Sequence, residues 1–241
     1  MRKQNNMMNI FCGMEKLSLV DFDGHLACTL FTGGCNYRCP FCHNSPLIHM
    51  QGPLEFDEIM KFLNSRKKML DAVVITGGEP TLHHVLPEVI KKIKELGFKI
   101  KLDTNGTNPK VLKELIDNKL IDYVAMDIKT SLNEYHIVTG TANPLLDKIK
   151  ESIDILKTSG IDYEFRTTLV KEYHTEKAIH EIKELLVGAK KLYLQKFVLR
   201  ETCLNQDLHE VDKDTANHYK TILESAINQV HLRGYEQNNF S

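Results

Sequence analysis

The sequence predicts an α/β fold, an open partial TIM barrel of six β/α units, (β/α)6. Short apolar runs alternate with longer segments whose apolar residues recur at helical spacing, as in parallel strands joined by right-handed crossovers. The run AVVIT at 72–76 is unbroken, as expected of a parallel strand covered on both faces. Six units are too few to close an eight-stranded barrel, so we expect a gap along one side.

The expected strands are short and apolar, and each is followed by a helical pattern. In chain order they are 26–31, 72–76, 98–104, 122–128, 162–170 and 191–199. The helices expected between and after them are 55–69, 85–97, 109–120, 145–160, 175–188 and about 212–233. Pro87 and Pro109 suit first turns, and Gly97 and Gly160 suit helix ends.

Composition favours one domain spanning residues 1–241. The chain is 42% hydrophobic and 26% charged, which is typical of a globular protein with a sizeable core. Its net charge of −1 gives no field that would attract nucleic acid or an anionic membrane. The N-terminus lacks a signal-peptide pattern, and no apolar run reaches the roughly 20 residues that span a bilayer. We therefore expect a cytoplasmic protein with no nucleic-acid or membrane partner.

Three cysteines stand close together in GCNYRCPFCHN (34–44). Cys35, Cys39 and Cys42 have the spacing C-x3-C-x2-C, in a chain with six cysteines. The other cysteines (Cys12, Cys28 and Cys203) show no framework spacing, which fits a reducing compartment better than a disulfide scaffold. The triplet is therefore predicted to bind metal.

The choice of metal turns on the absence of a fourth ligand nearby. Thiolates select zinc, Cu(I) or iron–sulfur clusters. A closed zinc site needs a fourth Cys or His, and His43 directly follows Cys42, too close in sequence to reach the same ion. Three thiolates are best explained by a four-iron cluster with one iron open to an outside ligand. A zinc-bound interaction module without catalysis remains the distant alternative.

Polar motifs follow the next three strands at the end where barrel enzymes place their chemistry. They are TGGEP (76–80), DTNG (103–106) and DIK (127–129). Each motif alone also has a structural explanation: a glycine turn, an Asn-Gly turn, a helix-capping aspartate or an exposed lysine. Their shared position after consecutive strands indicates one common cavity.

The cysteine spacing, with Phe41 before the last Cys and GGEP after the next strand, resembles the radical S-adenosylmethionine (SAM) superfamily. The resemblance covers essentially the whole chain and implies the radical SAM type of open barrel. It also implies that SAM, through its methionine amino and carboxylate groups, is the missing ligand of a [4Fe–4S] cluster. The segments GCNYRCPFCHNSPL, DYVAMDIK and SGIDYEFRTTLV are similar to glycyl-radical-enzyme activases, most of all the longer activating protein of anaerobic ribonucleoside-triphosphate reductase.

The resemblance assigns roles to individual residues. Cys35, Cys39 and Cys42 would hold three irons, and no further catalytic residue is expected. Glu79 would accept a hydrogen bond from the methionine ammonium, and Asp103 and Thr104, with Asp127, would match a monovalent-cation site. The full set of expected cofactor contacts is Phe41, His43, Asn44, Gly77, Gly78, Glu79, Asp103, Thr104, Asp127, Lys129 and Arg166. Phe197 stands where the related pyruvate formate-lyase activase has a histidine.

The implied activity is that of an oxidoreductase. It is reductive cleavage of SAM, followed by formation of a glycyl radical on a partner enzyme, expected to be anaerobic ribonucleotide reductase. An electron donor such as flavodoxin or ferredoxin would supply the electron. Two alternatives stay open within the superfamily: a pyruvate formate-lyase activase, and an enzyme acting on a small molecule, such as a deazapurine carboxylate synthase.

Overall fold

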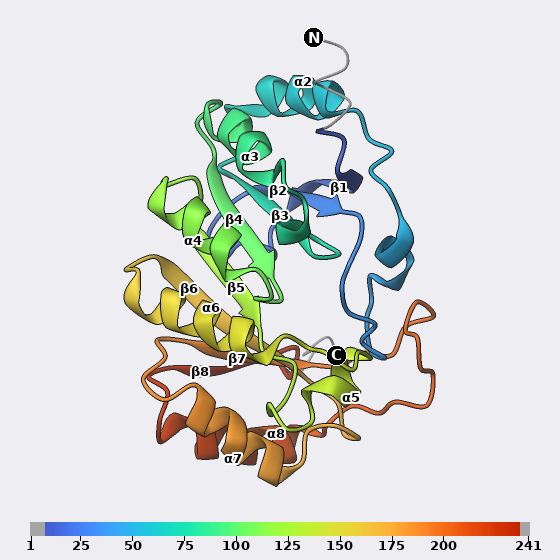
Figure 1. The fold of residues 1–241 in the computed structure, drawn as a ribbon, viewed down its shortest axis with the longest axis vertical. Coiled ribbons are helices and arrows are strands. Elements are labelled where there is room, and N and C mark those ends of the chain that lie inside the picture. Colours follow the sequence, from blue (N-terminus) through green and yellow to red (C-terminus); the bar gives the residue numbers. More distant parts are fainter. Residues whose placement is uncertain (1–7, 237–241) are drawn as a thin grey trace, which may run out of the picture. The chain divides into compact units, whose positions relative to one another are not determined.

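The computed structural model describes residues 8–236 (Figure 1). Its strands follow one another in the sheet in chain order, from β1 to β8, so the order is open. They are β1 (Phe11–Ser18), β2 (Ala27–Thr32), β3 (Ala72–Gly77), β4 (Lys99–Thr104), β5 (Tyr123–Asp127), β6 (Asp162–Leu169), β7 (Leu192–Lys196) and β8 (Val230–Arg233). β1 pairs antiparallel with β2, and β2–β3–β4 and β6–β7–β8 are parallel. The predicted open α/β fold is confirmed.

Helical segments connect these strands. They are η1 (Ser45–His49), α2 (Phe56–Arg66), η2 (Pro80–Leu82), α3 (Leu86–Lys94), α4 (Pro109–Asp117), α5 (Tyr135–Thr139), α6 (Leu146–Thr158), α7 (Glu176–Leu185) and α8 (Lys213–Glu224). Across residues 8–236, none of the helices combines the length and the apolar character that crossing a membrane requires.

The chain divides into two compact units, which are described separately. The first holds the residues up to Asn36, Asn44–Ala125 and Asp147–Asp162. The second holds Tyr37–His43, Met126–Leu146 and the residues from Tyr163. Cys35 therefore belongs to the first unit, and Cys39 and Cys42 belong to the second.

In the first unit, the strands β2, β3 and β4 are almost wholly buried, because helices cover them. Leu30, Ile75 and Ile100 are fully buried, and so are Ile90 and Ile93 of α3. These apolar residues recur at the spacing that places them on one face of each element. The packed strands fix the carboxyl ends from which the polar loops begin.

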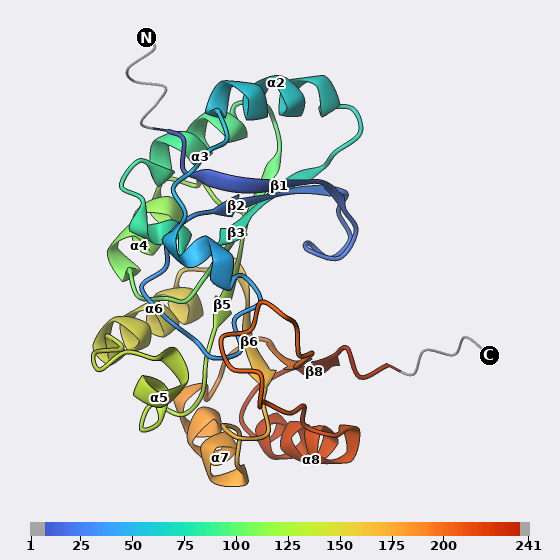
Figure 2. The same ribbon diagram turned by 90° about the vertical axis from the view of Figure 1, so that its right-hand side faces the viewer.

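In the second unit, α7 and α8 lie side by side, as the two views show (Figures 1 and 2). Thr175 caps α7, its hydroxyl accepting from the Ala178 N–H, and the carboxylate of Asp212 caps α8 by accepting from the Thr215 N–H. Ile182 of α7 and Leu223 of α8 are buried.

The sequence prediction missed both end strands. β1 and β8 were not expected, and the predicted final helix at about 212–233 was wrong in its second half. The helix α8 ends at Glu224, and Val230 pairs with Leu192 of β7. The short elements α5, η1 and η2 were also not predicted. The six expected strands and the first five expected helices are all present, with ends shifted by a few residues.

Candidate functional site

The glycine loop after β3 lies directly against the start of the cysteine segment. The N–H of Glu79 donates to the carbonyl of Gly34 at 2.8 Å, and the N–H of Gly78 donates to that of Thr32 at 2.9 Å. A Cβ at position 78 would collide with the Gly34 carbonyl, and Gly77 has φ +114°. Only glycines permit this approach, so the loop that carries Gly78 is held beside the residue that precedes Cys35.

A second set of bonds ties the residue after Cys35 to the loop after β4. Asn105 Nδ2 donates to Asn36 Oδ1 at 2.9 Å, and Asn36 Nδ2 donates to Thr107 Oγ1 at 3.0 Å. Sequence reasoning missed Asn36, Asn105 and Thr107 as site residues. The one available signal was that Asn105 lies within DTNG, where a turn explained it equally well.

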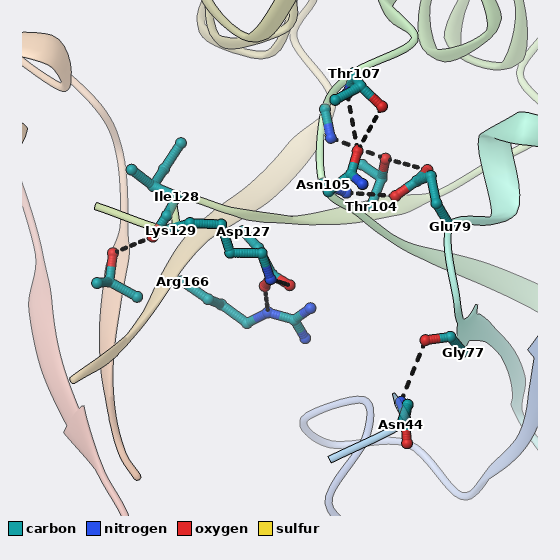
Figure 3. Close-up of polar contacts among 12 residues, drawn as sticks. Asn44, Gly77, Glu79, Thr104, Asn105, Thr107, Asp127, Ile128, Lys129 and Arg166 are labelled. Carbon is teal, nitrogen blue, oxygen red and sulfur yellow. Dashed lines mark hydrogen bonds and ion pairs between the residues drawn. The ribbon is translucent and has the colours of Figure 1, made fainter. Parts of the chain in front are cut away.

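Glu79 is 1% exposed, and its carboxylate is surrounded by donors from its own unit (Figure 3). Oε1 accepts from the hydroxyl of Thr104 at 2.7 Å and from both the N–H and the hydroxyl of Thr81, and Oε2 accepts from the Asn105 N–H at 2.7 Å. Burial raises the pKa of Glu79, and these hydrogen bonds oppose that rise. The carboxylate thus clamps the loops after β3 and β4 together.

Asn44 contacts the same glycine loop. Its Nδ2 donates to the carbonyl of Gly77 at 3.3 Å (Figure 3). Asn44 directly precedes η1, whose Leu47 carbonyl accepts from the Gly34 N–H at 2.9 Å. The structure therefore brings together Asn44, Gly77, Gly78, Glu79 and Thr104 among the predicted contacts.

In the second unit, Asp127 at the end of β5 is paired with two cations (Figure 3). Arg166 Nε lies 2.8 Å from Asp127 Oδ1, and Lys129 Nζ lies 2.9 Å from Oδ2. Burial alone would raise the pKa of Asp127, but the charges of Arg166 and Lys129 outweigh it and lower the pKa to about 2. The predicted trio of Asp127, Lys129 and Arg166 is thus one ionic cluster.

The backbone of Lys129 is fixed on both sides. Its N–H donates to the hydroxyl of Tyr135 at 3.1 Å, and its carbonyl lies 2.9 Å from Nε2 of the buried His174. Burial alone would lower the pKa of Lys129, but the charges of Asp127 and Cys39 raise it well above the usual range. The Lys129 cation is thus firmly positioned by its backbone contacts and by Asp127.

The segment from Arg38 to His43 is held by the end of α5 and by the loop after β7. The N–H of Arg38 donates to the Thr139 carbonyl at 2.8 Å, and that of Asn205 donates to the Pro40 carbonyl at 3.0 Å. The His43 Nε2 lies 2.7 Å from the Val198 carbonyl. These backbone contacts fix the path of the chain between Cys39 and Cys42.

Aromatic rings pack beside this segment. The His43 ring stacks on Phe197, with centroids 6.0 Å apart. Phe197 is 1% exposed, so this position packs rather than offering a polar contact. Phe41 is buried, and its ring centroid lies 6.3 Å from that of Tyr173.

The three thiols fit the donor set of an iron–sulfur cluster, since they are soft ligands on one loop. Cys39 is buried, and Cys35 and Cys42 are half-buried. Within residues 8–236, no three Cys, His, Asp or Glu side chains are placed as a ready-made metal site. The joint binding of one cluster by Cys35, Cys39 and Cys42 stays a prediction.

Comparison with known proteins places this site in a family. Residues 29–186 match the family described as "Radical SAM superfamily". A Methanocaldococcus jannaschii protein named "Putative glycyl-radical enzyme activating enzyme MJ1227" is 36% identical over 197 residues, which is 79% of this chain and 81% of that protein. A 7-carboxy-7-deazaguanine synthase of Aquifex aeolicus is 24% identical over 189 residues, 75% of this chain and 80% of the synthase.

A solved structure shares the fold. The crystal structure of Streptococcus suis SuiB bound to S-adenosylmethionine matches with a TM-score of 0.66 and 17% identity, covering 83% of this chain and 48% of SuiB. The family uses a [4Fe–4S] cluster and SAM, in agreement with the cofactors expected from the cysteine spacing. The chain, with its cysteine loop against a glycine turn, belongs to the radical SAM superfamily.

Proposed function

We propose that this chain is a glycyl-radical-enzyme activase, acting as a single domain over residues 1–241. The observation that carries the proposal is its 36% identity to a named activating enzyme along about four fifths of both chains. A second observation supports it. The chain has one C-x3-C-x2-C set, and its remaining cysteines do not form another.

The proposed chemistry divides between cofactor and chain. Cys35, Cys39 and Cys42 would hold the cluster, which when reduced would supply one electron for the cleavage of SAM to methionine and a 5′-deoxyadenosyl radical; that radical would remove a Cα hydrogen atom from a glycine of the partner. The chain positions SAM and keeps water away from the radical. No general base is required, because a hydrogen atom and not a proton is transferred.

The contacts around the glycine turn support roles for the predicted residues of the first unit that lie there. Gly77 and Gly78 receive the methionine part of SAM at a closely packed backbone. Glu79 and Thr104 position that backbone, since the Glu79 carboxylate already accepts four hydrogen bonds within the chain. Asn44 supports the same turn through its bond to Gly77.

The other predicted contacts lie in the second unit. Lys129 and Arg166 present positive charge suited to the carboxylate of SAM, and Asp127 orients both cations. Phe41 and His43 lie on the cysteine segment and contribute ring surface for the adenine.

For the partner we propose an anaerobic ribonucleotide reductase, on the likeness of the whole sequence to that class of activase. The electron would come from a flavodoxin or ferredoxin, and the reaction would take place in the cytoplasm. The two other activities within the superfamily, lyase activation and small-molecule chemistry, become outcomes of the test.

The test is direct transfer of a labelled hydrogen. The protein, reconstituted anaerobically with iron and sulfide, is mixed with SAM, dithionite and a candidate reductase grown on α-deuterated glycine. We expect a glycyl-radical EPR signal in the reductase and one deuterium in 5′-deoxyadenosine. A reductase whose radical glycine is replaced by alanine should give neither.

Other results would assign another function. A radical that forms only on a formate lyase would make the chain a lyase activase. If the protein cleaves SAM but forms a radical on none of the glycyl-radical enzymes tested, the result would contradict the activase proposal and favour a small-molecule substrate. Stoichiometric zinc without labile sulfide would contradict radical chemistry altogether.

A further inference from the structure

A buried lysine occupies the interior of the first unit. Lys101 of β4 is 4% exposed and lies two residues before Asp103, so both side chains project from one face of the strand. Its Nζ donates to the Asp21 carbonyl at 2.5 Å and lies 3.7 Å from Asp103 Oδ1. These partners replace the water that a deeply buried lysine head group loses.

Two aromatic rings complete the surroundings of the Lys101 ammonium. Its Nζ lies 5.9 Å from the ring centroid of Phe22 and 5.8 Å from that of Tyr123, within range of cation–π attraction. The charge therefore has a carbonyl oxygen, a carboxylate and two ring faces around it. An alkali cation would recruit the same hard oxygen donors from a protein.

The carbonyl of Asp21 is held in place by its own loop. This loop, residues 19–26, joins β1 to β2 and curls back beside them (Figure 2). Ser18 Oγ accepts from the N–H groups of Val20 and Asp21, and the Thr29 hydroxyl donates to Asp21 Oδ2 at 2.6 Å. Phe22 packs against Ala27, Ala72 and Val74. The acceptor is thus built into the fold.

These contacts do not fit the monovalent cation that the family resemblance implies. Asp103 already faces the Lys101 ammonium. The Thr104 hydroxyl donates to Glu79 and accepts from the Gly106 N–H, so a single lone pair of its oxygen is left for a cation. Asp127, the third expected ligand, is paired with Lys129 and Arg166.

We propose that Lys101 is a built-in substitute for a monovalent cation, so that the chain neither binds nor requires Na⁺ or K⁺ at Asp103. The positive charge that would otherwise come from solution is supplied covalently by β4. This deepens the proposed function and rests on it only in treating Asp103 as part of the SAM site. Lys101 acts as a positioning residue, since it acts through Asp103.

The first measurement uses the native protein reconstituted with its cluster. Its melting temperature is recorded in KCl, NaCl and choline chloride at one ionic strength, and ²⁰⁵Tl⁺ NMR reports binding of a K⁺ analogue. We expect equal melting temperatures and no saturable Tl⁺ signal. A higher melting temperature in KCl, or saturable Tl⁺ binding, would overturn the proposal.

The second measurement uses a variant that is expected to require a bound cation. Lys101→Met keeps the apolar stem and removes the positive charge that lies near Asp103, so a vacated oxygen site should take up K⁺. We expect the melting temperature of this variant to rise by about 3 °C in KCl over choline chloride when K⁺ is about tenfold above its Kd. Lys101→Arg, which keeps a positive charge, should show no K⁺ response.

A double variant tests whether the charge of Asp103 is the cause. Lys101→Met with Asp103→Asn removes both charges and should again be indifferent to K⁺. A folded Lys101→Met protein without any K⁺ response would contradict the proposal; if this variant does not fold, the Tl⁺ and KCl data on the native protein decide. None of these measurements uses SAM cleavage or a partner radical, so failure of the activase proposal would be seen separately.

Discussion

At the scale of single residues, one buried carboxylate and one half-buried carboxylate are stabilised in different ways. Glu79 accepts hydrogen bonds from hydroxyl and backbone donors, whereas Asp127 is paired with the cations Arg166 and Lys129. The sequence identified both positions because each follows a strand. It did not reveal the clamp made by Glu79, since Thr104 and Asn105 lie 25 and 26 residues further along the chain.

The charge of Asp127 makes stability depend on pH. Its pKa is lowered from 3.8 to about 2, so its contribution is complete above about pH 4 and is lost as the pH falls towards 2. We expect Asp127→Asn to lower the free energy of unfolding by about 2 kcal/mol at pH 7. The difference from the native protein should shrink across that acid range.

Urea unfolding of the cluster-free protein would measure this, because an iron–sulfur cluster does not survive acid. Asp154→Asn on α6 is the control, because Asp154 is exposed. The free energy of unfolding of this variant should equal that of the native protein at every pH. If the free energy of unfolding of Asp127→Asn stays below that of the native protein by the same amount from pH 7 to pH 2, the ion pairs of Asp127 do not cause the pH dependence of stability.

At the scale of elements, local patterns predicted what local interactions determine. Continuous apolar runs identified β3 and β5, and the helical stripe with its final glycine identified α3. β8 was missed because Ile222, Leu223 and Val230 continue an apolar pattern at roughly helical spacing, and only pairing with β7 makes Val230 part of a strand. β1 likewise depends on its antiparallel partner β2.

The glycine turn after β3 gives an element-scale prediction. In Gly78→Ala the new Cβ meets the Gly34 carbonyl, so the turn must move away from the cysteine segment. The expected cost is about 2 kcal/mol, seen as a loss of SAM affinity of more than about tenfold. Equilibrium dialysis of SAM against the reconstituted protein would measure it.

The matched control is Gly13→Ala in β1. There the nearest atom to an added Cβ, on the Phe31 ring, lies at an ordinary 3.6 Å, and no positive φ is needed. This variant should bind SAM as the native protein does. If Gly78→Ala binds SAM as tightly as the native protein does, the glycine turn is not part of the SAM site.

At the scale of the whole molecule, burial varies systematically along the sheet order. The inner strands β3 and β4 are mostly buried, whereas most positions of the end strands β1 and β8 are half-buried or exposed. The number of β/α units could be read from the sequence, because each unit forms its own pattern. The identity of the end strands could not, because it depends on partners far away in the chain.

This gradient predicts the order of amide hydrogen exchange. Amides of β3 and β4 should exchange at least about 100-fold more slowly than those of β8, since local opening of an end strand exposes less apolar surface. Mass spectrometry of exchanged peptides would measure the rates. Protection of β8 equal to that of β3 would mean that the sheet opens only as a unit.

The loop between β1 and β2 has one more consequence. It lies at the amino end of β2, opposite the glycine turn, yet its Asp21 carbonyl helps to hold the Lys101 ammonium, which lies near Asp103 on the same strand. The stability of the protein would then be independent of the Na⁺ and K⁺ concentrations because of this hairpin and one lysine. Transplanting both into a relative that depends on an alkali metal should transfer that independence without touching a cysteine.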